Sequence, residues 1–217
     1  MSKIIYLLSP LKKEGSISLP MISFSIVVKS IEFLDCDTLM FTSKQAVVSA
    51  NAIDTSWKNY PSIAIGKATK AKIEELGGTV IYSPKSFYGK SLAEDIKKFF
   101  SDKKILYLRP KVVSFDSKAY LKESDIELKE QILYETSCKC YQKEQQPKKN
   151  SIIIFTSPST INCFFKSFEW DSSYSAVLIG KATREHLPQE CNFWIADEPL
   201  IDSCLKKAIE ITENRAG

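Results

Sequence analysis

Short apolar runs and segments with helical spacing alternate along most of the chain. A short apolar run bounded by turn residues is typical of a buried strand, whereas apolar residues three and four positions apart indicate an amphipathic helix. We predict strands at 3–8, 22–31, 37–41, 62–65, 79–82, 104–108, 128–134, 151–155, 176–179 and 192–195, and helices at 43–52, 68–76, 91–100, 116–123, 158–167, 182–187 and 200–213. Strands that alternate with helices favour a parallel sheet with right-handed crossovers, so the predicted fold class is α/β.

Turn chemistry supports two of these helix boundaries. Gly77-Gly78 follows the helix at 68–76, and a glycine in the left-handed region ends many helices. Ser91 and Glu94 have the spacing of a capping box, which predicts that the next helix begins at this point.

Two motifs occur once in each half of the chain. Phe-Thr-Ser stands at 41–43 and again at 155–157, and Ile-Gly-Lys-Ala-Thr stands at 65–69 and again at 179–183, so both motifs repeat at the same interval. Each motif ends a predicted strand and opens a helix, which is where α/β units place groups that bind a ligand. We therefore expect two similar α/β lobes that face a shared ligand.

The second half is short of one strand, which the otherwise unpaired strand at 3–8 is able to supply. The second lobe would then be discontinuous, with the first lobe inserted into it. We predict two similar parallel-sheet, flavodoxin-like lobes joined by two crossing strands. The ranges are 1–20 with 141–217 for the discontinuous lobe, 36–128 for the inserted lobe, and 21–35 and 129–140 for the crossing strands.

Length and charge limit the kinds of partner. A chain of 217 residues is long enough for two compact domains, each with its own core. The formal net charge of +4 suits a small anionic ligand better than a nucleic acid, which usually requires a dense basic stripe. The apolar run at the N-terminus is too short for a signal sequence or a membrane span. We expect a cytoplasmic, soluble monomer that binds neither nucleic acid nor membrane.

Cysteine and histidine usage argues against two kinds of active site. The six cysteines are scattered without a Cys-x-x-Cys pair, and His186 is the single histidine. A zinc site or a Ser-His-Asp triad is hard to assemble from these residues, so we predict no metal ligands and interpret most cysteines as buried thiols.

The repeated turns supply the candidate binding groups. A helix N-terminus carries unpaired N–H groups and a positive dipole end, which together suit carboxylate or phosphate. Arg109 ends a predicted strand, where side chains of a parallel sheet point into the binding crevice. The remaining candidates from the turns are Ser43, Ser157, Gly66, Gly180, Thr69, Thr183, Lys67 and Lys181.

Each candidate also has a purely structural interpretation. Serine and threonine before a helix are most often simple caps, and a glycine there can serve only close strand-to-helix packing. The lysines can be solvated surface charges, and Tyr134 can be an interface residue. An ancestral duplication without retained function would explain the repeat as well.

At these residues the sequence resembles uroporphyrinogen-III synthase. The resemblance covers nearly the whole chain and rests on the order and spacing of short motifs. Those motifs are Phe41-Thr42-Ser43, Phe155-Thr-Ser-Pro-Ser159, Gly66 to Thr69, Gly180 to Thr183, Leu108-Arg109 and Leu133-Tyr-Glu-Thr136. The sequence departs from the family at Lys67 and Lys181, where proline or a small residue is more usual, and at Pro110, where glycine often follows the arginine.

The resemblance implies a lyase of tetrapyrrole biosynthesis that needs no cofactor or metal. The substrate would be hydroxymethylbilane, a linear tetrapyrrole with eight carboxylates, which is cyclised with loss of water and inversion of ring D. It implies Tyr134 as the catalytic residue, a candidate general acid. The implied substrate-binding residues are Thr42, Ser43, Gly66, Lys67, Thr69, Arg109, Ser157, Ser159, Gly180, Lys181 and Thr183.

Two other function classes remain open at the level of the sequence. A non-enzymatic two-lobed binding protein for a small anionic ligand would have the same lobes and crossings. A phosphate-handling enzyme is less favoured, because the chain has neither a Gly-x-x-x-x-Gly-Lys-Ser/Thr loop nor an acidic cluster at the predicted strand ends.

Overall fold

The computed structural model describes residues 3–84 and 88–213, and the chain divides into two compact units. The inserted unit comprises residues 24–136. The discontinuous unit combines residues 1–23 with 137–217. The chain therefore enters the inserted unit once, leaves it once, and completes the discontinuous unit afterwards.

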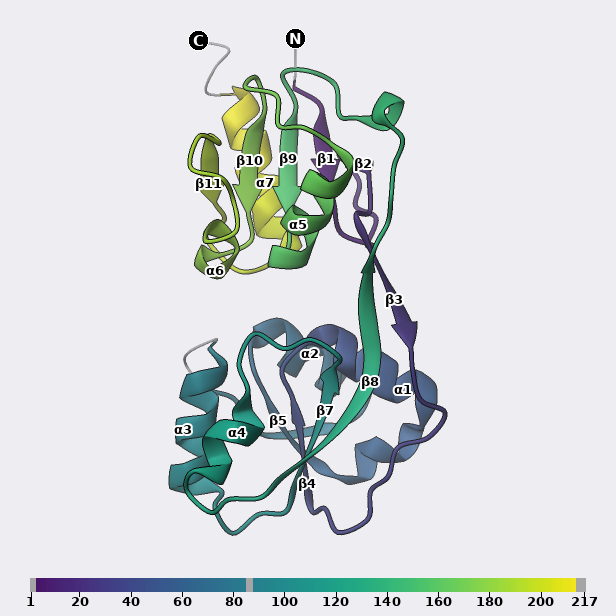
Figure 1. The fold of residues 1–217 in the computed structure, drawn as a ribbon, viewed down its shortest axis with the longest axis vertical. Coiled ribbons are helices and arrows are strands. Elements are labelled where there is room, and N and C mark those ends of the chain that lie inside the picture. Colours follow the sequence, from purple (N-terminus) through teal and green to yellow (C-terminus); the bar gives the residue numbers. More distant parts are fainter. Residues whose placement is uncertain (1–2, 85–87, 214–217) are drawn as a thin grey trace. The chain divides into compact units, whose positions relative to one another are not determined.

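A six-stranded sheet forms the inserted unit, in the order β3-β8-β7-β4-β5-β6 (Figure 1). The pairs among β4, β5, β6, β7 and β8 are parallel. At the edge, Val27 N donates to Leu133 O and Lys139 N donates to Met21 O, so β3 runs antiparallel to β8. The strands are β3 (Ile22–Ile26), β4 (Thr38–Phe41), β5 (Pro61–Ala64), β6 (Thr79–Tyr82), β7 (Ile105–Pro110) and β8 (Leu128–Cys138).

Alternate residues of these strands fill two cores, one on each face of the sheet. Leu39 and Phe41 pack with α1, α2 and Trp57, while Met40 packs with α3 and α4 on the opposite face. Figure 1 shows α3 and α4 together on one side of this sheet. The helices are α1 (Lys44–Ile53), the 3-10 helix η1 (Thr55–Asn59), α2 (Lys67–Glu75), α3 (Gly89–Phe99) and α4 (Ser117–Lys122).

A parallel sheet in the order β11-β10-β9-β1-β2 forms the discontinuous unit. Strand β1 pairs with β9 through Tyr6 and Ile153, which confirms that the N-terminal strand completes the sheet of the second half. The short β2 was not predicted. The strands are β1 (Ile5–Leu7), β2 (Ile17–Ser18), β9 (Ile152–Phe155), β10 (Ser175–Leu178) and β11 (Phe193–Ile195).

The sheet of the discontinuous unit is also covered on both faces. Ile153 and Phe155 pack against α5, whereas Ile152 and Ile154 pack against α7 on the other face (Figure 1). Burial on both faces explains why these strands are continuous apolar runs. The helices are the 3-10 helix η2 (Lys143–Gln145), α5 (Pro158–Ser167), α6 (Lys181–Arg184) and α7 (Ile201–Glu213). The α/β, parallel-sheet prediction is confirmed for both units.

The structure bears out one predicted helix boundary and corrects another. Gly77 adopts a φ of 87° and its N–H donates to Glu74 O, so it ends α2 as a left-handed cap. The capping box at Ser91 and Glu94 is wrong. Helix α3 begins at Gly89 after Tyr88, so Ser91 lies inside the first turn. Local spacing cannot distinguish a cap from a first-turn residue when the helix starts earlier.

The cysteine interpretation also needs a correction. Cys138, the last residue of β8, forms a disulfide with Cys163 of α5, with a distance of 5.2 Å between their Cα atoms. Cys191 and Cys204 are buried thiols as expected, but Cys140 is exposed. Cysteine spacing does not indicate this pair, because the disulfide joins segments that meet only in the folded unit.

Candidate functional site

The repeated motifs occupy equivalent places in the two units. Because β4 and β5 are parallel neighbours, their carboxyl ends bring the turns at Thr42-Ser43 and Gly66 together. The pair β9 and β10 does the same for Ser157 and Gly180. The same hydrogen bond follows in both units: Ile65 N donates to Phe41 O at 2.9 Å, and Ile179 N donates to Phe155 O at 3.0 Å.

Both motif serines cap helices. Ser43 Oγ accepts a hydrogen bond from Ala46 N at 3.1 Å at the start of α1. Ser157 Oγ accepts from Thr160 N at 3.3 Å, and Thr160 Oγ1 accepts from Ser157 N at 3.2 Å, which completes a capping box on α5. The structural interpretation of these serines is therefore confirmed, and each hydroxyl still has a hydrogen to donate.

The two motif glycines differ in backbone conformation. Gly66 precedes α2 with φ 84° and ψ 146°, in a region that is essentially restricted to glycine. Gly180 precedes α6 with φ −177° and ψ 172°, which is extended backbone open to any residue. A glycine is therefore required by geometry in the inserted unit but not in the discontinuous one.

The remaining candidates of the two turns differ in exposure. Lys67 and Lys181 are exposed at the first position of α2 and α6. Thr69 and Thr183 follow two residues later and are only 4% and 3% exposed. Ser159 and Thr42 are half-buried. The lysines therefore present charge at the surface, while the threonines lie under the helix starts.

Tyr134 lies beside the Thr42-Ser43 turn of the inserted unit. Its hydroxyl lies 2.9 Å from Ser43 Oγ, and the residue is only 4% exposed, with its ring packed edge-on against Phe24. Burial raises the pKa of Tyr134, and the hydrogen bond with Ser43 offsets part of that rise. The phenol therefore keeps its proton at neutral pH and is able to act as a hydrogen-bond donor.

A β-bulge directs Tyr134 toward Ser43. Arg109 of β7 pairs with Ile132 of β8, but the next residue, Pro110, pairs with Tyr134, so Leu133 is the extra residue. Without it Tyr134 would face α3 and α4. With it, Leu133 and Tyr134 both join the core beside α1. The bulge thus re-aims one side chain at the carboxyl end of the sheet.

A second tyrosine reaches the same turn from the opposite face. Tyr107 of β7 is 2% exposed and its hydroxyl lies 2.6 Å from Thr42 Oγ1. Burial raises the pKa of Tyr107 to about 12. Each hydroxyl of the Thr42-Ser43 pair is therefore hydrogen-bonded to one buried phenol.

Arg109 uses much of its guanidinium within its own unit. Nη1 donates to Pro110 O at 3.0 Å and to Lys111 O at 3.2 Å. Nε lies 3.2 Å from Glu130 Oε1, although it is not aligned for a hydrogen bond with that oxygen. Lys111 N in turn donates to Tyr134 O at 2.8 Å. Arg109 therefore braces the turn that holds the bulge beside Tyr134.

The comparisons with known proteins identify the family. The family model described as uroporphyrinogen-III synthase HemD matches residues 14–206. The chain belongs to this family. The sequence comparison with curated proteins gives no match.

Solved structures of uroporphyrinogen-III synthases have the same fold. The uroporphyrinogen-III synthetase of Helicobacter pylori 26695 is 25% identical with a TM-score of 0.77, over 96% of this chain and 99% of that one. A mutant uroporphyrinogen III synthase of the extremely thermophilic bacterium Thermus thermophilus is 10% identical with a TM-score of 0.64, over 99% of this chain and 100% of that one, and it shows the fold alone.

Sequence reasoning missed two residues beside the predicted synthase site. Tyr107 and Glu130 are paired across β7 and β8, and both contact predicted residues, Thr42 and Arg109. The sequence contains one weak indication of the role of Tyr107. A tyrosine in a fully apolar strand needs a partner for its hydroxyl, and the nearest polar positions lie at strand ends.

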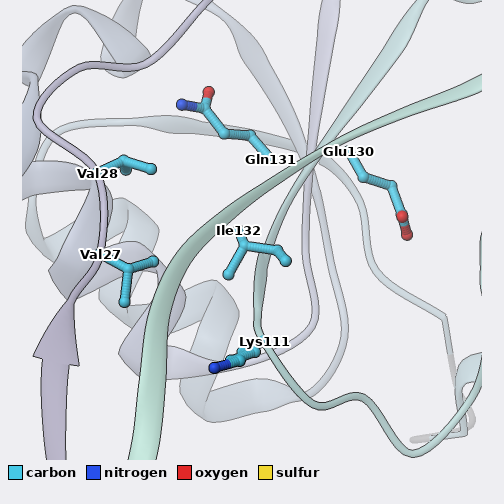
Figure 2. Close-up of a pocket in the computed structure, with 6 residues that line it drawn as sticks. All are labelled: Val27, Val28, Lys111, Glu130, Gln131 and Ile132. Atoms are coloured by element: carbon cyan, nitrogen blue, oxygen red, sulfur yellow. The ribbon is translucent and has the colours of Figure 1, made fainter.

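Two depressions of the surface are lined by residues outside the predicted set, and one of them borders Arg109 through Glu130 and Lys111. One, of about 410 Å³, is lined by Val27, Val28, Lys111, Glu130, Gln131 and Ile132. Figure 2 shows its valines on the segment after β3 and Glu130 and Gln131 pointing to opposite sides of β8. The other, of about 370 Å³, lies at the amino ends of β7 and β8. Neither one contains a predicted site residue.

The described residues contain neither a membrane-spanning helix nor a cluster of metal-binding side chains. Across residues 3–84 and 88–213, no helix is long and apolar enough to cross a membrane. Within the same ranges, no three histidine, cysteine or acidic side chains gather where they could hold a metal ion.

Proposed function

We propose that this chain catalyses the reaction of its family, the cyclisation of hydroxymethylbilane to uroporphyrinogen III with loss of water and inversion of ring D. The family match over residues 14–206 carries this proposal. The likeness to the Helicobacter pylori synthetase over nearly the whole of both chains supports it. A non-enzymatic binding protein is not favoured, since nothing in either comparison points to that class.

The reaction requires a proton donor and a protein that holds the substrate in one conformation. Protonation of the substrate hydroxyl releases water and leaves an azafulvene-type cation. Ring D attacks this cation through its substituted carbon, and the resulting spiro intermediate fragments and recloses through the other carbon of ring D, which is thereby inverted. The reclosure releases one proton, which restores the acid. Without enzyme the bilane closes without inversion, so the protein contributes mainly orientation.

Tyr134 and Ser43 are our candidates for delivering the proton. Tyr134 is buried and its hydroxyl faces Ser43, which is half-buried at the end of β4. A proton from the phenol would therefore pass to Ser43 Oγ while the Ser43 hydrogen passes to the leaving hydroxyl. The raised pKa of Tyr134 makes it a weak acid, so the step depends on close positioning rather than acid strength.

The substrate carboxylates call for hydrogen-bond donors and positive charge. We propose that the helix starts and exposed lysines of both repeated turns bind them. The proposed set is Thr42, Ser43, Gly66, Lys67, Thr69, Arg109, Ser157, Ser159, Gly180, Lys181 and Thr183. We further propose that the protein acts in the cytoplasm as a monomer. The proposed lobes are residues 1–20 with 141–217 and residues 36–128, and the proposed crossing strands are 21–35 and 129–140.

The product isomer tests the proposed function. Enzymatically generated hydroxymethylbilane is added to the purified protein, the products are oxidised, and type I and type III uroporphyrin are separated. We expect type III to dominate. Type I alone, at the rate of the uncatalysed closure, would contradict the proposal and favour a binding protein.

A further inference from the structure

The two hydroxyls at the end of β4 are held by tyrosines from opposite faces of the sheet. Thr42 follows Met40 in the strand alternation and meets Tyr107 on the face covered by α3 and α4. Ser43 follows Phe41 and meets Tyr134 on the face covered by α1. Tyr107 lies outside the set of residues proposed above.

The surroundings of Tyr107 decide which hydroxyl donates. Its ring is packed among apolar residues such as Met40, Ile63 and Ile105, and Thr42 Oγ1 is the hydrogen-bond partner that the structure gives its hydroxyl. A buried hydroxyl must place its proton on an acceptor. A phenol is also far more acidic than an aliphatic hydroxyl and is the better donor.

We propose that Tyr107 is a positioning residue that donates to Thr42 Oγ1 and so leaves the Thr42 hydrogen directed out of the core, toward a carboxylate of the tetrapyrrole substrate. This inference rests on the proposed function and adds a residue to it. Thr42 is half-buried, whereas Tyr107 is buried, so Tyr107 acts through Thr42 rather than on the substrate itself.

The proposal predicts a change in substrate binding rather than in the chemical step. A carboxylate takes no part in the bonds that form and break, so a contact to it is held equally in the ground state and the transition state, and its loss raises KM with kcat unchanged. We expect Tyr107→Phe to raise KM about threefold to tenfold, while kcat stays within about twofold.

A double-mutant cycle tests whether Tyr107 acts through Thr42. Tyr107→Phe, Thr42→Val and the double variant are compared for KM, kcat and the free energy of unfolding. We expect the double variant to have the KM of Thr42→Val alone. The proposal is overturned if Tyr107→Phe leaves KM unchanged, or if the two increases in KM multiply in the double variant.

Tyr174 provides a matched control. It is a buried tyrosine of the discontinuous unit, 1% exposed, whose hydroxyl donates to Pro147 O. Tyr174→Phe removes a buried hydrogen bond of the same kind and should leave KM unchanged. An increase equal to that of Tyr107→Phe would indicate a general loss of packing and would overturn the proposal.

Two measurements keep the result unambiguous. The wild-type protein must first form type III product, because type I alone would refute the proposed function and this inference with it. Should Tyr107→Phe fail to fold, Thr42→Val is compared with Thr42→Ser, which retains the hydroxyl. The proposal requires valine, and not serine, to raise KM, and equal KM values for the two variants overturn it.

Discussion

At the scale of single residues, identical motifs have different backbone requirements. Gly66 has φ 84° and Gly180 has φ −177° although both stand in Ile-Gly-Lys-Ala-Thr. A Cβ built at Gly180 would meet nothing within 4 Å. The conformation of a glycine is therefore decided by its unit and not by its neighbours in the sequence.

This difference predicts opposite effects of alanine at the two positions. Gly66→Ala should lower the free energy of unfolding by about 1 to 3 kcal/mol, because alanine is strained at this φ and ψ. Gly180→Ala should be neutral or stabilising by up to about 1 kcal/mol, because it restricts only the unfolded chain. Urea unfolding measures both, and equal destabilisation of the two variants would refute the argument.

The proposed proton transfer from Tyr134 through Ser43 also depends on single residues. If Tyr134 delivers its proton through Ser43, then Tyr134→Phe and Ser43→Ala should each lower kcat by about 100-fold, and the double variant no further. Full turnover in a folded Tyr134→Phe would exclude the phenol as the acid.

Ser43→Ala also removes a helix cap, so it needs a control. Asp116 caps α4 in the same unit, where its Oδ1 accepts from Ala119 N at 2.9 Å. Asp116→Ala should cost about 1 kcal/mol of stability, like Ser43→Ala, but leave kcat unchanged.

At the scale of elements, the disulfide joins the end of β8 to α5. Cys138 and Cys163 are 25 residues apart in the chain, and closing a loop of this length stabilises a protein by about 2 to 4 kcal/mol. Reduction, or Cys138→Ser, should lower the free energy of unfolding by this amount. Cys140→Ser, at an exposed free thiol, should have no such effect.

Thiol labelling checks the same bond directly. Alkylation of the unfolded, unreduced protein should modify Cys36, Cys140, Cys191 and Cys204 and spare the other two cysteines. Labelling of all six without a reductant would show that the bond is absent.

At the scale of the whole molecule, burial shifts the pKa values of phenols and thiols upward in both units. Burial raises the pKa of Tyr107 to about 12 in one unit and that of Cys204 to about 12 in the other. Between the unfolded and folded pKa values the native state binds more protons, so stability falls as pH rises.

We therefore expect the contribution of these groups to the free energy of unfolding to be complete below about pH 8 and to fall from about pH 9 to 12. The slope for each such group is at most about 1.4 kcal/mol per pH unit. Urea unfolding between pH 8 and 11 measures it, with Tyr107→Phe as the variant that loses its own share above pH 10. A stability that rises over this range would contradict the sign.

The sequence by itself determined the alternation of strands and helices, the duplicated turns, the strand that Lys3 to Leu8 supplies, and the family resemblance. These features are local or periodic in the sequence. A strand buried on both faces of its sheet is a continuous apolar run, so the sequence shows it directly. The Ser91 capping box failed because local spacing does not specify where a helix starts.

Only the tertiary structure decided which residues meet at the predicted site. The Thr42–Tyr107 hydrogen bond joins residues 65 positions apart, and the Ser43–Tyr134 bond joins residues 91 apart. The first depends on the pairing of β4 with β7, and the second depends on the order of β4, β7 and β8 and on one bulge that turns Tyr134 to the other face. Strand order and register are set by the packing of the whole unit, so no short stretch of sequence specifies them.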